Sequence, residues 1–270
     1  MFHQSHARPP PRRLSPRPHS RCREYRQGPF KIMRIDILPL LALQVTASIL
    51  PEPQNIFSNL PASDWKIPTV HESAVQARRI LRLTNLATLS TVFPSEKSDA
   101  GAQENRPSGL GGAPIGLMDY YADCEASGDP TILAIGIATS FKNVNAGSNI
   151  TMSLRWHPQD GRWHSAAALP RFSLLGHLED ISDEEVKEEG VTACFVKSHP
   201  DSVAWLPGNS IHASRWVRLV VDQVYWIGGF GDRAYIGWIP AEEWKSVTQE
   251  EIEGIKLPGE KASWNWNKLW

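Results

Sequence analysis

The stretch between Trp216 and Trp244 constrains the fold of this chain more than any other part. Its β-branched and aromatic residues predict two strands joined by a tight connection at Asp222-Gln223, then a bend over residues 228–231 and a further short strand. Pro240 is placed to begin a helical turn, because proline suits the first turn of a helix. The chain is therefore expected to end in an antiparallel sheet followed by a helical turn.

A helix is predicted near the start of the folded region, from about Val70 to Asn85. Thr69 and Glu72 form the capping box that begins it, in which each side chain satisfies a free backbone N–H. The apolar face is formed by Ala74, Ala77, Ile80 and Leu81, and the opposite face by Arg78, Arg79 and Arg82. The β-branched content of residues 86–93 then predicts a strand.

The middle of the chain has the pattern of further strands, at residues 115–121, 131–138, 150–156 and 171–178. Strict alternation of apolar and polar residues in 150–156 predicts one buried and one wetter face. Residues 94–112 are polar and rich in small residues, and we interpret them as a mobile loop. A second capping box, Ser182 with Glu185, predicts a helix that ends before Pro200. The fold class expected is mainly β with flanking helices.

The first 47 residues have the composition of a leader. An Arg- and Pro-rich start is followed by Met33, a short apolar run and small residues up to Ala47, as in a secretory signal cleaved there. A mitochondrial transit peptide is the alternative, and Met33 is an alternative start. We assign residues 48–68 to a linker, 69–247 to one folded domain and 248–270 to a Trp-rich tail. No segment of the mature chain is apolar enough to span a membrane.

Charge and cysteine usage narrow the class of protein. The formal net charge is −1 and the basic residues gather in the leader, which disfavours nucleic-acid binding by the folded domain. Cys124 and Cys194 form one disulfide or remain two separate buried thiols, and the sequence leaves both open. Asn149-Ile150-Thr151 is a glycosylation sequon at the entry to a strand.

The usual catalytic motifs are missing. The sequence has no zinc-binding His-Glu-x-x-His helix, no Gly-x-Ser-x-Gly elbow and no phosphate-binding Gly-x-x-x-x-Gly-Lys loop. The histidines of the folded region lack metal-ligand spacing, so no metal site is predicted.

Three segments together resemble a known family. They are the helix-strand pair of residues 72–93, the strand of residues 149–156 and the C-terminal run. Their order resembles the flavin-mononucleotide-binding split β-barrel of the pyridoxamine 5'-phosphate oxidase superfamily, and most closely its CREG-like branch. The resemblance implies an antiparallel split barrel, a homodimer and a secreted or vacuolar/endolysosomal glycoprotein that binds a partner, such as another protein, without catalysis.

The alternative implied by the same resemblance is an FMN-dependent oxidoreductase. In flavin-binding split barrels, side chains of Arg, Lys, Ser and Thr hold the phosphate. The matching positions here are Ser90, Thr91, Ser140 and Lys142. The strand of residues 115–121 lacks the basic residue of the flavin enzymes and carries Asp119 instead, so no cofactor is favoured. Heme binding, known in related split barrels, ranks third.

Overall fold

The computed structural model describes residues 66–97 and 106–261. The predicted leader, most of the linker and the end of the tail lie outside these residues. In the described part, seven strands form one antiparallel sheet in the order β2-β1-β4-β5-β6-β3, with β7 also paired to β6. The strands are β1 (Leu86–Val92), β2 (Pro114–Tyr120), β3 (Thr131–Ile135), β4 (Ile150–Arg155), β5 (Arg171–Asp180), β6 (Ser214–Ile227) and β7 (Ile236–Pro240).

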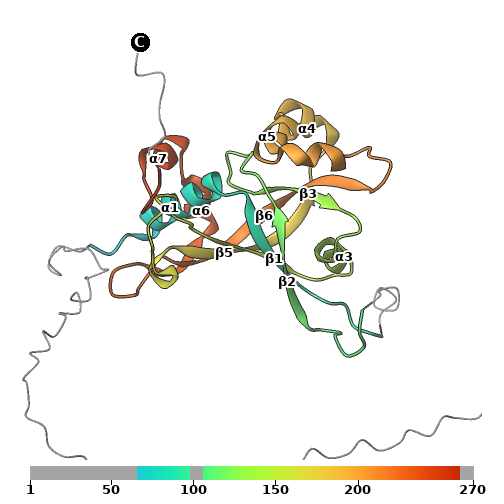
Figure 1. Cartoon of the computed structure of the whole chain (residues 1–270), viewed down its shortest axis with the longest axis horizontal. Helices are drawn as coiled ribbons and strands as arrows, with labels where there is room; N and C mark the ends of the chain where they lie inside the picture. The colour runs from blue at the N-terminus through green and yellow to red at the C-terminus, as the bar shows by residue number, and fades with distance from the viewer. Residues whose placement is uncertain (1–65, 98–105, 262–270) are drawn as a thin grey trace, which may run out of the picture. The chain divides into compact units, whose positions relative to one another are not determined.

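In the described residues, five helices lie in two groups at the ends of this sheet, and α3 packs against β1. Figure 1 shows α1, α6 and α7 gathered at one end and α4 with α5 at the other. Their bounds are α1 (Val70–Leu83), α3 (Thr139–Asn145), α4 (Asp183–Glu188), α5 (Val191–Ser198), α6 (Ala241–Ser246) and α7 (Gln249–Gly254), with short 3₁₀ helices η2 (Ala166–Ala168) and η3 (Pro200–Trp205). The predicted antiparallel split β-barrel with flanking helices is confirmed.

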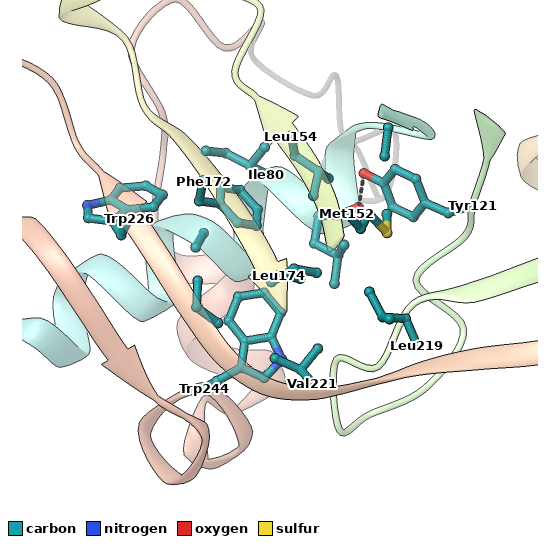
Figure 2. Packing of buried hydrophobic residues seen from close by; sticks show 14 of the residues in the cluster. Ile80, Tyr121, Met152, Leu154, Phe172, Leu174, Leu219, Val221, Trp226 and Trp244 are labelled. Atoms are coloured by element: carbon teal, nitrogen blue, oxygen red, sulfur yellow. Dashed lines mark hydrogen bonds between the residues drawn. The ribbon is translucent and has the colours of Figure 1, made fainter. Parts of the chain in front are cut away.

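One face of the sheet forms the core. Alternation along β4 buries Ile150, Met152 and Leu154, as predicted, and leaves the residues between them on the other side. The apolar side of α1 covers this buried face, and its Ala74, Ala77, Ile80 and Leu81 are all fully buried. Figure 2 shows side chains of α1, β4, β5 and β6 meeting there with Trp244. We call the opposite side of β1, β2 and β4–β7 the open face.

Both predicted capping boxes are present. Thr69 with Glu72 begins α1, and Ser182 with Glu185 begins α4. The helix expected to continue to Pro200 is instead two helices, with a break at Glu189-Gly190 before α5. The folded unit also continues past Val247, because α7 buries Ile252 in the core.

The tight turn predicted at Asp222-Gln223 was wrong. Residues 214–227 form one continuous strand, β6, in which Asp222 is an extra, bulged residue opposite the step from Leu175 to Gly176. A Cβ atom at Gly176 would lie 1.9 Å from the carbonyl oxygen of Val220, so the bulge requires glycine on the neighbouring strand. The bulge lets a single long strand bend where the sequence pattern indicated a turn.

The prediction that Arg78 lies on the solvent side of α1 was also wrong. Its side chain is fully buried, and its guanidinium donates to the carbonyls of Ala126, Ser127 and Trp244 at 2.8–3.1 Å. A Cβ atom at Gly128 would lie 2.4 Å from the same guanidinium, so the loop can approach this closely only with glycine there. Backbone carbonyls distant in sequence therefore provide acceptors, and these hydrogen bonds offset part of the free-energy cost of removing the charge from water.

Replacement of Arg78 should destabilise the protein strongly. Arg78→Met leaves three carbonyl groups without their donor, and we expect a loss of about 3 kcal/mol in the free energy of unfolding. Arg78→Lys should lose less, because an ammonium keeps the charge but not the planar fork. Urea unfolding of both variants measures the effect.

The matched control is Arg162→Met, at an exposed arginine. It should change the unfolding free energy by no more than about 0.5 kcal/mol. Equal effects at positions 78 and 162 would show that the buried hydrogen bonds contribute nothing specific.

Candidate binding site

The predicted phosphate residues on β1 point to opposite sides of the sheet. Ser90 and Thr91 are neighbours in a strand, where successive side chains alternate between faces. Thr91 is buried on the core side, and its hydroxyl accepts a hydrogen bond of 2.9 Å from the side-chain amide of Asn143. Ser90 lies on the open face, in register with Gly116 and Thr151.

The other two predicted residues lie on a helix. The strand expected over residues 131–138 ends at Ile135, and α3 begins at Thr139. Within α3, Ser140 is buried, whereas Lys142 is exposed. Ser90 and Thr91 therefore point away from each other, and the buried Ser140 and the exposed Lys142 differ in their access to solvent. Their assignment to a flavin phosphate stays a prediction.

The predicted glycosylation residue is accessible. Asn149 is exposed in the short connection between α3 and β4, directly before the first buried residue of β4. A sugar attached to its side chain would meet no buried part of the sheet.

A different region of the structure has the form of a binding site. A hollow of about 230 Å³, here called the Trp205 pocket, lies where the ends of β1, β2 and β3 meet α5 and η3. Its apolar walls are Leu86, Met118, Leu133, Ile135, Phe195 and Trp205, and its polar members are Asp119, Tyr120 and Ser202. Mostly apolar walls with few polar groups are typical of small-molecule sites.

Covalent and aromatic contacts hold the helical wall of this pocket against β2. Cys124, in the segment after β2, forms a disulfide with Cys194 of α5, which settles the question that the sequence left open. The His199 ring stacks on Tyr120 with centroids 4.1 Å apart. His199 Nε2 lies 2.9 Å from the carbonyl oxygen of Tyr121, and the Tyr120 hydroxyl donates to Asp201 at 3.0 Å. The wall is thus tied to the strand by a covalent bond, a ring stack and two hydrogen bonds.

Two polar residues of the Trp205 pocket are at least partly removed from water. Burial raises the pKa of Asp119, although its carboxylate accepts a hydrogen bond from the backbone N–H of Tyr120 at 2.8 Å. Ser202 is fully buried and its hydroxyl has no hydrogen-bond partner. A buried hydroxyl without a partner costs stability.

Sequence reasoning missed this pocket. The sequence pattern marks Asp119 only as a departure from the flavin enzymes, and it indicates no binding role for Ser202 or Trp205. The usable signal was the run from His199 to Trp205, where a histidine, a serine and a tryptophan interrupt a polar surface segment. Its proximity to β2 depends on the disulfide, whose pairing the sequence did not reveal.

Metal clusters and membrane-spanning helices are both absent from residues 66–97 and 106–261. No group of three or more His, Cys, Asp or Glu side chains is placed to hold a metal ion there. Over the same residues, no helix has the length and apolar character needed to cross a membrane.

The half-buried carboxyl of Asp119 should make stability depend on pH in a defined direction. Its pKa is higher in the folded than in the unfolded protein, so its contribution to stability falls as pH rises from the ordinary aspartate pKa to the folded pKa. Asp119→Asn removes this cost, and we expect a higher free energy of unfolding at neutral pH and no gain near the ordinary aspartate pKa. Urea unfolding at the two pH values measures it.

The control for this experiment is Asp232→Asn, at an exposed aspartate between β6 and β7. This change should alter stability little at either pH. A loss of stability in Asp119→Asn that is the same at both pH values would contradict the prediction.

Comparison with known proteins places this geometry in a family. Residues 68–246 match the family model described as CREG, beta-barrel. No curated protein matches the sequence at a significant level. Among solved structures, the heme binding protein from Mycobacterium smegmatis is similar with a TM-score of 0.50 and 19% sequence identity, over 67% of this chain and 62% of that one.

Two further structures are more distant. The protein Atu2129 from Agrobacterium tumefaciens, of unknown function, has a TM-score of 0.46 and 21% identity, over 70% of this chain and 65% of that one. HutZ, the heme storage protein from Vibrio cholerae, has a TM-score of 0.39 and 14% identity, over 56% of this chain and 90% of that one. This chain thus spans less than two thirds of the Mycobacterium and Agrobacterium proteins, and identities this low bear on the fold alone. The family model covers the whole sheet described above, and the chain belongs to the CREG β-barrel family.

Proposed function

We propose that this protein is a secreted or vacuolar/endolysosomal glycoprotein that acts by binding, without turning over a substrate. The observation that carries the proposal is the placement of Ser90 and Thr91 on opposite faces of β1, with the Thr91 hydroxyl already paired to Asn143. A split barrel whose candidate phosphate donors do not converge is poorly suited to hold a flavin. The Trp205 pocket instead offers a small apolar hollow with Asp119 and Tyr120 among its few polar residues.

The disulfide and the sequon support a secretory destination. Disulfides form and persist in oxidising compartments and are rare where thiols are kept reduced. Cys124 and Cys194 close a loop with a sequence separation of 70, for which a disulfide contributes about 4 kcal/mol by the loop-entropy model. Asn149 is exposed, as an N-linked glycan requires. These features favour a secretory signal in residues 1–47 over a mitochondrial transit peptide.

The open face supports a homodimer. Met118, Thr88, Ser153, Ser173, Tyr225 and Trp238 form one cross-strand row on this face. The ends of the row are apolar and accessible, with Met118 70% exposed and Trp238 52% exposed. A row with small hydroxyl side chains at its centre and large side chains at its ends suits contact with a second copy of the same chain.

Two cofactor-based functions are the rivals. An FMN-dependent oxidoreductase would need Ser90, Thr91, Ser140 and Lys142 to reach a common phosphate. Heme binding is suggested by the name of the similar Mycobacterium smegmatis protein. The buried His199, however, is occupied by the Tyr121 carbonyl and the Tyr120 ring, which leaves it unsuited as an iron ligand. We rank both below a binding role without catalysis.

Visible absorption of the purified protein distinguishes these functions. The full-length chain is expressed in a secretory host, supplied with FMN or heme and then desalted. We expect a colourless protein whose molar mass by light scattering is that of a dimer. Near-stoichiometric flavin bands would overturn the non-catalytic proposal, and Lys142→Ala and Ser90→Ala would then show whether the predicted phosphate residues hold the flavin.

Secretion and glycosylation are checked with one substitution. Treatment with an N-glycosidase should increase the gel mobility of the secreted wild type and leave that of Asn149→Gln unchanged. Asn145→Gln, at an exposed asparagine of α3 outside the sequon, is the matched control and should behave like the wild type. Retention of the wild type inside the cell, without glycan, would contradict the secretory assignment.

A further inference from the structure

Two arginines lie directly opposite each other where β4 and β5 are joined. Arg155 ends β4, Arg171 begins β5, and their Cα atoms are register partners in the antiparallel pair. Like charges in directly opposed positions of a sheet destabilise it. Such an arrangement therefore calls for a compensating negative charge.

The described residues do not supply that negative charge. Arg155 Nε donates to His157 Nε2 at 2.7 Å, and Arg171 Nη1 donates to the carbonyl of Ala167 at 3.3 Å. Neither guanidinium forms an ion pair with a carboxylate of residues 66–97 or 106–261. Asp160 is the one acid in the connection between the two strands, and it is bound to His164 at 3.0 Å and to the backbone N–H of Arg162 at 3.0 Å.

His157 behaves as an acceptor for one of these arginines. Its pKa is lowered, first by burial and second by the charge of Arg155, which keeps the ring neutral. A neutral imidazole nitrogen can accept the Nε–H of Arg155, and this contact leaves the two terminal nitrogens of the guanidinium free to donate elsewhere.

The paired arginines border open space on both sides. A hollow of about 580 Å³ lies beneath the β4–β5 connection, and another of about 300 Å³ opens on the neighbouring part of the open face. Both hollows are lined by Arg155 and Arg171. Trp163, which lines the larger one, is 74% exposed and presents its ring to solvent.

The two arginines and Trp163 together suit a ligand in which a phosphate or sulfate group is attached to a ring. Guanidinium groups bind phosphate and sulfate through paired N–H donors. An exposed indole ring provides a surface on which the face of a sugar or a flat aromatic ring can pack. We propose that Arg155 and Arg171 form a binding site for the phosphate or sulfate ester of a small ring compound, with Trp163 contacting the ring. This site is separate from the Trp205 pocket and does not depend on a flavin.

Titration calorimetry on the full-length secreted protein tests the site. The probes are inorganic phosphate, inorganic sulfate, glucose 6-phosphate and glucose 6-sulfate, in chloride buffer of matched ionic strength. The proposal expects binding of at least one ester, and tighter binding of that ester than of the inorganic ion because of Trp163. The two esters distinguish phosphate from sulfate as the natural group. A wild type that binds none of the four probes overturns the proposal.

Substitutions identify the groups responsible. Arg155→Gln with Arg171→Gln should weaken ester binding at least about tenfold, which corresponds to about 1.4 kcal/mol. Arg215→Gln, at an arginine of β6 paired with Asp180, is the matched control and should bind like the wild type. Trp163→Ala should abolish the preference for the ester over the inorganic ion. Unchanged binding in the double variant would overturn the proposal.

A stability measurement separates binding from a structural role. The bound ester should raise the melting temperature of the wild type, because a ligand that binds only the folded state stabilises it. Without ligand, the single variant Arg155→Gln should melt no lower than the wild type, since it removes a like-charge contact, and the ester should raise its melting temperature less. An Arg155→Gln variant that melts well below the wild type and responds fully to the ester would show that Arg155 is structural.

Discussion

The fold depends on one buried cation. Arg78 leaves α1 at its apolar side and donates to carbonyls of two separate segments, the loop at residues 126–127 and the end of α6. Its guanidinium also lies over the Trp244 ring, 5.3 Å from the centroid. Since Trp244 packs against Phe172 of β5, this one side chain joins the first helix, the loop that leads into β3 and the C-terminal helices to the sheet. His71, between Glu243 and Glu251, adds contacts at the surface of the same junction.

The other end of the sheet is held by different chemistry. A second, smaller cluster containing Leu133, Phe195 and Trp216 lies under α4 and α5, and the disulfide fixes α5 to the segment after β2. A small cluster buries little apolar area, and a covalent link compensates for this. The Trp205 pocket lies at this covalently fixed end, so its walls keep their spacing without a ligand to organise them. A preformed hollow of this kind lowers the ordering cost of binding.

The sequence predicted correctly those features that depend only on residues close together in the chain. The capping boxes at Thr69 and Ser182 depend on residues three positions apart, and the alternation in β4 is a property of six consecutive residues, so both were confirmed. Arg78 and Asp222 were misjudged because each depends on distant backbone, the carbonyls near Ser127 for one and the close approach at Gly176 for the other. The flavin assignment paired Ser90 with Thr91 by proximity along the chain, whereas a strand separates neighbours across its two faces.

Several polar groups of the structure cost stability. Ser202 is buried without a partner, burial disfavours the charge of Asp119, and Arg155 opposes Arg171 across a strand pair. Ser202 is not alone in lacking a partner, because Arg78 Nε, Thr131 Oγ1 and Asn143 Oδ1 are also buried without a hydrogen bond. A buried group without a partner therefore does not by itself indicate a ligand, whereas two directly opposed like charges lower the stability of the free protein in a way that a bound anion would relieve. The Trp205 pocket would then take a largely apolar molecule and the arginine pair an anion, so the two sites have different ligands on one scaffold.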